Sequence, residues 1–458
     1  MSDYPIPATR VVRNTGAALR VIEADIVVVG AGISGISAAL EAAKLGRSVV
    51  LVDAGQQLGG QSTGSMLGTF CGFYSNGPQP YRVVYGMVDE MFAHLQREGA
   101  FHLRRGRNSY IPLYQEQALV RWIEQAVHAA GIEVLLGATL LQVQRDGGRV
   151  ASLRLATRFG QIELRGQGFV DASGDAALSY LAGFDCREPV SPIMGTLMFT
   201  LEGYDEAAAL RLDRWAMQKR LAETGGTYGL VRRDGFVFAF PGKGQATVNM
   251  THVETPLDAA GYAKAQAEGR AQADRVVAFL RGEYADAFAN ARVRQYGFLG
   301  IRQTRWIVGG HSLQVEEVRQ GLKPADAILR CSWPVELHDR AEDVHWEEFG
   351  DDHLHYLPFR SMVPRGADNL VAAGRCIDGD PAALSSVRVM GPCVAMGAAA
   401  AQALDLAGAG SVTQIDIAAL RQRLQDNLER RDPAGTGSRR RTVFTVALPA
   451  YPPAAAAA

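Results

Sequence analysis

The chain has 458 residues, of which 47% are hydrophobic, and its 48 acidic and 47 basic residues give a formal net charge of −1. This length allows a large buried core and two or three domains. The balanced charge argues against nucleic acid or an anionic membrane as the main partner.

The cysteines and the N-terminus bear on the compartment. Five cysteines lie far apart without a Cys-x-x-Cys pair, which argues against a disulfide framework or a zinc site. Met1–Leu19 contains no apolar segment of the kind found in signal peptides. The most apolar stretch, Cys393–Ala409, is interrupted by Gln402 and Asp405 and is too short to span a bilayer. We therefore expect a cytoplasmic protein with no bound metal.

The first predicted unit is a strand, a glycine turn and a helix at the start of Val21–Gly60. In the turn, Gly30 lets the chain leave the strand sharply, and Gly32 lets the backbone approach a pyrophosphate. Gly35 lets the helix lie close to the sheet. This order of parts predicts a dinucleotide-binding site.

Two further features support this site. The pyrophosphate would lie at the helix N-terminus, at Ile33 and Ser34, where free N–H groups and the helix dipole favour negative charge. A second strand, Ser48–Asp53, ends in an acid that is placed to accept hydrogen bonds from an adenosine ribose. Asp53 does not by itself distinguish FAD from NAD.

The rest of the chain divides by pattern. Helical and hairpin-like segments continue to about residue 188, after which strand-like pieces alternate with long charged helices. The overall prediction is an α/β fold, with a Rossmann-like FAD-binding domain that carries an inserted α+β substrate domain. The predicted divisions are 21–188 (first part of the FAD-binding domain), 189–352 (inserted domain), 353–410 (its C-terminal part), 411–430 (a C-terminal helix) and 431–458 (a disordered tail).

Three later segments favour FAD over a nicotinamide cofactor. The Gly59-Gly60 pair would let the chain wrap over the pyrophosphate, with Gln61 and Ser62 running along the ribityl arm. A strand that ends near Gly174 would bring backbone to the same ligand. The remaining positions, expected near the ring end of an extended cofactor, are Gly374, Arg375, Gly391 and Pro392.

At these residues the sequence resembles the two-dinucleotide-fold flavoproteins, specifically FAD-dependent oxidoreductases related to fumarate reductase and glutathione reductase. The resemblance covers most of Ala24–Leu406 and is most specific in the segments Gly300–Gly309, His355–Gly366, Asn369–Ile377 and Ser386–Gly397. It implies that the N-terminal glycines and Asp53 hold the ADP part of FAD. It also implies that the helix at Gly391 and Pro392 points at the pyrimidine edge of the flavin, where a positive helix end stabilises the reduced ring.

Two absences narrow the chemistry. No second Gly-x-Gly-x-x-Gly occurs, because the segment that starts at Gly242 lacks the third glycine, so we expect no separate NADPH domain. No cysteine pair follows Gly60, which argues against disulfide exchange. Covalently flavinylated relatives use a histidine shortly after the glycine pair, and its absence here predicts non-covalent FAD.

The candidate catalytic residues lie near the C-terminal half. His355 and its neighbour Tyr356 precede Arg360, and a histidine there could act as a general acid or base. Arg360 and Arg388, like Arg302 and Arg305, could bind a carboxylate or stabilise negative charge. The alternative is that His353 and His355 are surface or packing residues and that the arginines form domain-interface ion pairs. The Gly-rich loop 64–74 could line the flavin or simply pack closely.

One segment could also suggest a metal site. Residues 338–353 contain several carboxylates and the histidines His338, His345 and His353, but their spacing follows no known ligand pattern. A solvated acidic loop is the favoured interpretation.

The leading functional hypothesis is an enzyme that transfers a hydride between a small organic substrate and FAD. A second hypothesis is an FAD-binding tRNA-modifying or assembly protein, which the missing basic stripe disfavours. A binding module without turnover is a third, because a fold does not fix a reaction. The sequence leaves open the substrate, the electron donor or acceptor, the reaction direction and the oligomeric state.

Overall fold

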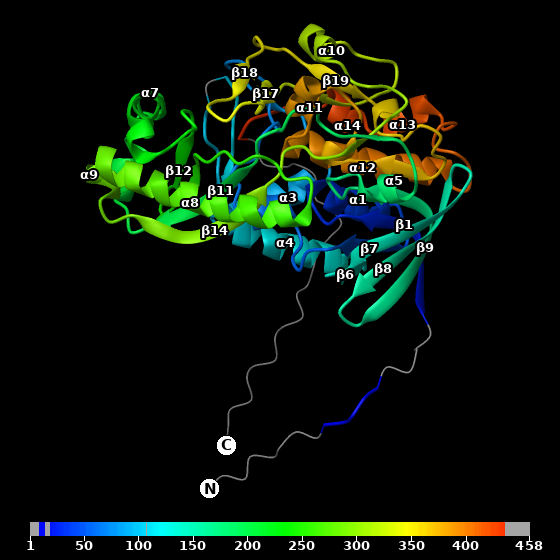
Figure 1. Ribbon diagram of the computed structural model, residues 1–458. Helices are drawn as coiled ribbons and strands as arrows, with labels where there is room; N and C mark the ends of the chain where they lie inside the picture. Colours follow the sequence, from blue (N-terminus) through cyan, green and yellow to red (C-terminus); the bar gives the residue numbers. More distant parts are fainter. Residues whose placement is uncertain (1–8, 14–18, 107, 436–458) are drawn as a thin grey trace, which may run out of the picture.

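The computed structural model describes residues 9–13, 19–106 and 108–435 (Figure 1). Its larger part is built on a seven-stranded mixed sheet in the order β6-β2-β1-β9-β8-β7, with β20 also beside β9. The strands are β1 (Arg20–Val29), β2 (Val49–Asp53), β6 (Glu133–Leu136), β7 (Thr139–Asp146), β8 (Arg149–Thr157), β9 (Gly160–Asp171) and β20 (Leu370–Ala372). Strands β6, β2, β1, β9 and β20 pair in parallel. The predicted α/β class is confirmed.

Strand β9 joins the two ends of the chain. Its first half pairs antiparallel with β8, and its last residues pair in parallel with β20, so that Phe169 lies beside Leu370. This single strand of 12 residues therefore reaches from the pairing with β8 to the pairing with β20. Because β9 also pairs with β1, the segment after β20 returns to the glycine turn that follows β1.

Two helices cover the parallel strands on the side of the glycine turn. They are α1 (Ile33–Lys44) and α12 (Met390–Ala407), and nearly every residue of α12 is buried. The two helices lie against each other at Gly397, where a Cβ atom would overlap the backbone of Ser34. The Ser37 hydroxyl donates to the carbonyl oxygen of Val394 across the same contact (2.7 Å). Small residues therefore set the close approach of α1 and α12, a contact that the sequence did not indicate.

The inserted part lies at the opposite end of the molecule from β7 and β8 (Figure 1). It contains an antiparallel sheet in the order β12-β13-β11-β14. Its strands are β11 (Thr196–Glu202), β12 (Phe236–Phe240), β13 (Gln245–Asn249) and β14 (Arg292–Gly300), and its helices are α6 (Glu206–Leu210), α7 (Arg214–Thr224), α8 (Ala259–Glu283) and α9 (Ala285–Phe288). A second hydrophobic core, from Leu197 to Ile301, belongs to this unit alone.

The inserted unit is narrower than the sequence suggested. Trp306, Leu313 and Ile328 pack in the larger core and not in the core of the inserted sheet. Strand pairing explains this, because β15 pairs with β10 and β16 pairs with β19. The elements of this region are β10 (Cys186–Arg187), β15 (Trp306–Ile307), α10 (Val315–Gln320), β16 (Ala327–Cys331), β17 (Val335–Leu337), β18 (His345–Glu347), β19 (His355–Pro358) and α11 (Pro381–Val387).

The remaining elements are short, apart from two helices that pack beside α1. The remaining elements are α2 (Gln61–Gly64), β3 (Tyr81–Arg82), α3 (Met87–Arg97), β4 (Phe101–His102), β5 (Leu113–Tyr114), α4 (Glu116–Ala129), α5 (Ala177–Leu181), α13 (Ile417–Arg423), α14 (Gln425–Glu429) and β21 (Asp432–Pro433). The two helices beside α1 are α3 and α4. The predicted tail begins too early, since β21 pairs with β3. Residues 436–458 lie outside the described residues.

One pair of helices has the composition of a membrane segment. Within the described ranges, no single helix is both long and apolar enough to cross a bilayer. Helices α11 and α12 meet that test only when they are taken together, and the chain bends by 88° between them.

Candidate functional site

The three glycines of the first turn have different surroundings. Gly30 has a φ of +104°, and a Cβ atom there would overlap the carbonyl of Ala172, while a Cβ atom at Gly35 would overlap the carbonyl oxygen of Gly30. These two positions are closed by the protein itself. Gly32 differs, because a Cβ atom there would meet nothing within 4 Å. Gly32 therefore faces open space at the start of α1, as expected for the glycine that a phosphate approaches.

The start of α1 is free to bind an anion. Among the described side chains, none caps this helix, whose N-cap is Gly32. The first N–H groups of an α-helix, here those of Ile33, Ser34 and Gly35, have no partner within the helix. The helix dipole adds partial positive charge at the same point. The start of α1 thus offers the donors that a pyrophosphate needs.

Asp53 has a structural role that the sequence did not indicate. Its Oδ2 atom accepts a hydrogen bond from the N–H of Ala31 (2.6 Å), and its Oδ1 atom accepts one from the N–H of Gly55 (2.6 Å). The carboxylate therefore ties the end of β2 to the glycine turn. Each carboxylate oxygen can accept a second hydrogen bond, so the ribose contact predicted for Asp53 stays compatible with this geometry.

The glycine pair packs directly on the first turn. The N–H of Gly59 donates to the carbonyl oxygen of Ala31 (2.8 Å), and a Cβ atom at Gly60 would lie 2.9 Å from the Cα atom of Gly32. Ser62 turns back to the carbonyl oxygen of Gly59 (2.6 Å), and Gln61 donates to the carbonyl oxygen of Ile301 (2.9 Å). The pair therefore borders the open space at Gly32, and Gln61 links it to the end of the inserted sheet.

Arg375 ties together three segments. Its Nε atom donates to the carbonyl oxygen of Gly174 (2.5 Å), its Nη2 atom lies 3.1 Å from Asp175 Oδ1, and its Nη1 atom donates to the carbonyl oxygen of Ile301. A Cβ atom at Gly174 would lie 2.7 Å from this guanidinium, and one at Gly374 would lie 2.6 Å from Ser34 Oγ. The predicted positions near Gly174 and Gly374 are thus brought to the start of α1.

The N-terminus of α12 meets the Gly-rich loop 64–74. The N–H of Gly391 donates to the carbonyl oxygen of Cys71 (2.9 Å), and a Cβ atom at Gly391 would overlap the carbonyl of Gly72. A Cβ atom at Gly72 would in turn lie 2.9 Å from Pro392 Cδ. One N–H group at this helix end is therefore already bonded within the protein, which the sequence did not indicate. The loop and the helix end form one packed unit.

The predicted catalytic histidine lies in the core. The His355 side chain is fully buried, with Nε2 2.9 Å from Ser386 Oγ and Nδ1 3.4 Å from His353 Nε2. Burial, with the neighbouring His353, lowers the pKa of His355 to about 3. A ring with both nitrogens in protein contacts and no solvent exposure is a packing residue, which was the alternative interpretation.

The other three candidates are not gathered in one place. Tyr356 is half-buried beside Lys323, whose Nζ atom lies 5.3 Å from the ring centroid. Arg360 is exposed and lies 3.8 Å from Asp326. Arg388 lies at the end of α11, and its Nη2 atom donates to the backbone carbonyl oxygen of Glu336 in β17 (3.0 Å). Successive residues of a strand face opposite sides, and this separates His355 from Tyr356.

A group of charged residues that the sequence did not indicate lies between the two cores. We call it the interface cluster; its members are Arg232, His252, Arg302, Glu336, His338 and Arg388. His252 Nε2 lies 2.9 Å from His338 Nδ1, and His338 Nε2 lies 3.1 Å from Glu336 Oε1. Burial, followed by the charges of Arg388 and Arg232, lowers the pKa of Arg302. His338, expected in a solvated loop, is 1% exposed. Because these residues come from segments far apart in the sequence, no local sequence pattern predicts that they meet.

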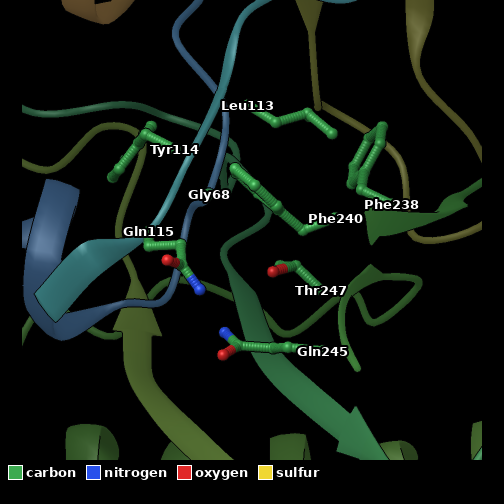
Figure 2. Close-up of a pocket in the computed structure, with 8 residues that line it drawn as sticks. All are labelled: Gly68, Leu113, Tyr114, Gln115, Phe238, Phe240, Gln245 and Thr247. Carbon is green, nitrogen blue, oxygen red and sulfur yellow. The ribbon is translucent and has the colours of Figure 1, made fainter. Parts of the chain in front are cut away.

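A small hollow opens between β5, the start of α4 and the inserted sheet, with room for about one water molecule. Figure 2 shows the amide ends of Gln115 and Gln245 pointing toward one another, with Thr247 beside them. The rest of the hollow is lined by the aromatic side chains of Tyr114, Phe238 and Phe240, together with Leu113 and Gly68. The adjoining Glu116 is buried, and burial raises its pKa to about 7.

Comparison with known proteins identifies the family. The model of the FAD dependent oxidoreductase family matches residues 25–424, and the chain therefore belongs to this family. Cofactor and enzyme class follow: the protein is an FAD-dependent oxidoreductase. No match is found among curated proteins.

Several solved structures are similar at low identity. A geranylgeranyl bacteriochlorophyll reductase-like protein from Thermoplasma acidophilum is 14% identical, with 89% of this chain and 83% of that chain covered and a TM-score of 0.43. The flavin-dependent brominase Bmp2 is 14% identical, with 88% of this chain and 83% of that chain covered and a TM-score of 0.44. The p-nitrophenol 4-monooxygenase from Pseudomonas putida is 12% identical, with 89% and 82% covered and a TM-score of 0.44.

Proposed function

We propose that this enzyme transfers a hydride between a small organic substrate and non-covalently bound FAD, and that the substrate binds where the inserted sheet meets the FAD-binding fold. The FAD-binding part of the proposal rests on the open space at Gly32, bordered by Gly60 and by the uncapped start of α1. When bound, FAD supplies a two-electron acceptor or donor. Ile33 and Ser34 would hold the pyrophosphate through their N–H groups.

The observation that carries the substrate site is the junction itself. The interface cluster and the hollow of Figure 2 both lie between the inserted sheet and the larger core, and both contain buried polar groups. Small-molecule sites often lie at domain interfaces and combine apolar walls with a few convergent polar groups, and the hollow, which by itself holds about one water molecule, would form one corner of such a site. Phe238 and Phe240 would supply the apolar wall, and Gln115 and Gln245 would orient polar groups of the substrate.

Arg388 is the predicted catalytic candidate that this proposal keeps. It lies at the end of α11, and its pKa is lowered by burial. Arg302 faces it from the inserted side, beside the carbonyl oxygen of Met194 (2.7 Å). Two guanidinium groups in a partly desolvated junction favour a substrate that carries a carboxylate or another anion.

Anaerobic reduction of the bound flavin tests the proposal. The purified enzyme is mixed with amines, hydroxy acids and enoates in turn, and the flavin absorbance is followed. Gln245→Trp, which fills the hollow, should raise the KM for the reducing substrate at least tenfold while FAD stays bound. Gln125→Trp is the matched control at a half-buried position on α4. An unchanged KM in Gln245→Trp would contradict the placement of the substrate.

A further inference from the structure

Three polar contacts in a row cross the junction between the two cores. The carbonyl oxygen of Ala341 lies 3.0 Å from His252 Nδ1, His252 Nε2 lies 2.9 Å from His338 Nδ1, and His338 Nε2 lies 3.1 Å from Glu336 Oε1. All three distances are those of hydrogen bonds. We call this row the histidine chain.

The number of protons in the histidine chain is fixed by its chemistry. Both ends of the row are oxygens, and an ionised carboxylate, like a carbonyl, only accepts. Three hydrogen bonds therefore need three protons on ring nitrogens or on the carboxyl group. A neutral imidazole carries one, so that two neutral rings supply two. The row is one proton short unless it takes up a further proton.

The surroundings keep both rings neutral. Burial lowers the pKa of His338, and the guanidinium groups of Arg302, Arg232 and Arg388 lower it further. Burial also lowers the pKa of His252, with added effects of Arg232 and Arg302. Asp234 neutralises part of this charge, because it accepts a hydrogen bond from Arg232 (2.7 Å). A further proton taken up by the row would therefore be shared along it and would not rest on an isolated imidazolium.

Only one end of the histidine chain can exchange that proton. The His338 side chain is 1% exposed, whereas that of Glu336 is 21% exposed. At the other end, His252 is 4% exposed and meets a backbone carbonyl, which does not titrate. The Glu336 carboxylate is fixed by the indole N–H of Trp333 (2.9 Å), and its backbone carbonyl oxygen accepts from Arg388.

From this geometry we propose that the histidine chain is the proton store of the reaction, with Glu336 as the group that exchanges the proton with the substrate and His338 and His252 as positioning residues. The inference rests on the proposed function. When a substrate is oxidised, a C–H bond gives its hydrogen and both electrons to FAD, and an adjacent O–H or N–H bond gives its proton to Glu336. The chain then holds three protons and three hydrogen bonds. Substrate reduction reverses each transfer.

Glu336→Gln separates proton exchange from structure. The amide N–H of glutamine can donate to His338 Nε2, so that three hydrogen bonds persist with two neutral rings and no exchangeable proton. We expect folding and FAD binding to be kept, and flavin reduction to slow by about 10²–10⁴-fold, as for loss of a general acid–base group. Glu336→Asp, which keeps the carboxyl group, should restore part of the rate.

Nitrogen-15 NMR of the histidines tests the chain without substrate or turnover. The protein has nine histidines, and single His→Gln variants assign them. In the wild type, the ring signals of His252 and His338 should change together in one pH step, and Glu336→Gln should abolish that step in both. Independent titration of the two rings, or a step that survives Glu336→Gln, would overturn the proposal. Because this readout needs no substrate, it can fail or succeed separately from the proposed function.

A second carboxylate–histidine pair provides the control. His311 Nε2 lies 2.9 Å from Glu317 Oε2, beside α10 and outside the interface cluster. Glu317→Gln should leave the rate of flavin reduction and the signals of His252 and His338 unchanged. If Glu336→Gln behaves like Glu317→Gln in the rate measurement, Glu336 does not exchange the proton.

Discussion

The glycine turn and the interface cluster are built in opposite ways. The turn uses the backbone of a short run of sequence, in which Gly30 and Gly35 fit because they lack a side chain. The cluster uses charged side chains from segments far apart, and His252 and His338 meet across 86 residues. Binding the pyrophosphate of a cofactor needs only N–H groups and space, whereas a reaction needs particular side chains. The two regions therefore divide cofactor binding from substrate chemistry.

The energetic cost of the two regions also differs. Close approach at the turn requires no fully buried charge, because the polar groups there are backbone N–H groups and carbonyls and the half-buried Asp53 carboxylate, which two backbone N–H groups bind. The cluster holds several charges away from water, which is unfavourable unless each is bonded or paired. Arg232 meets this condition through Asp234 and Asn249. Strongly perturbed groups at a domain junction are typical of functional sites.

The largest expected effect separates two glycines of the turn. Gly35→Ala places a Cβ atom on the carbonyl oxygen of Gly30, and because backbone cannot move aside, we expect a loss of more than about 3 kcal/mol in the free energy of unfolding. Gly32→Ala meets open space and should leave the unfolding of the FAD-free protein nearly unchanged while FAD binding weakens. Urea unfolding and FAD titration measure the two effects.

A matched control is available for both variants. A Cβ atom at Gly226 also meets nothing within 4 Å, and Gly226 lies in the inserted unit, far from the turn in sequence. Gly226→Ala should change neither stability nor FAD binding. Equal FAD affinity in Gly32→Ala and Gly226→Ala would show that the cofactor does not approach Gly32.

The next effect distinguishes His355, a buried histidine of the larger core, from the two buried histidines of the interface cluster. The pKa of His355 is about 3 in the folded protein, below the ordinary value near 6.5, so the unfolded chain binds its proton first as the pH falls. Stability is therefore lost below about pH 6.5, by about 1.4 kcal/mol per pH unit, or roughly 2–3 kcal/mol down to about pH 4.5.

Removal of the core histidine should flatten this dependence. Urea unfolding at several pH values is compared between wild type, His355→Gln and His128→Gln, the last being an exposed control on α4. The difference between wild type and His355→Gln should shrink as the pH falls from 6.5 to 4.5. A constant difference would mean that His355 takes up a proton in the folded protein. Flavin reduction should persist in His355→Gln, whereas Glu336→Gln should lose most of it.

The sequence predicted the turn well because its signals are local. The glycines, the apolar strand β1 and the acid at Asp53 lie within one short segment, and their order has one structural interpretation. The same reasoning placed His355 at the site, because periodicity cannot tell which face of β19 meets the core. It missed His252 and the burial of His338, since their contact depends on how β13 and β17 approach through the tertiary fold.

A smaller effect is expected at Asp53, whose carboxylate binds backbone N–H groups of the turn and would also bind the ribose of FAD. Asp53→Ala removes two hydrogen bonds to backbone N–H groups, each worth about 1.5–3 kcal/mol when the acceptor is charged and less where it is exposed. We expect FAD affinity to fall by about 30-fold and the stability of the FAD-free protein to fall with it. Asp53→Asn retains an acceptor and should lose less of both. FAD titration of the three proteins, with thermal unfolding of each, checks this. If Asp53→Ala lowers the stability of the FAD-free protein but not its affinity for FAD, Asp53 holds the turn and does not contact the ribose.

The smallest effect tests which predicted arginine belongs to the junction. Arg360 is exposed and 3.8 Å from Asp326, a surface pair worth about 0–1 kcal/mol, so Arg360→Ala should leave flavin reduction unchanged. Arg388 lies in the interface cluster, and Arg388→Ala should raise the KM for an anionic substrate about tenfold, with a smaller change for an uncharged analogue. Steady-state kinetics with such a pair of substrates measures this. If Arg360→Ala and Arg388→Ala have equal effects on the KM, the charge of Arg388 does not contribute to substrate binding. The contrast between the glycine turn, which is built from backbone, and the interface cluster, which is built from side chains, would then rest on the histidine chain alone.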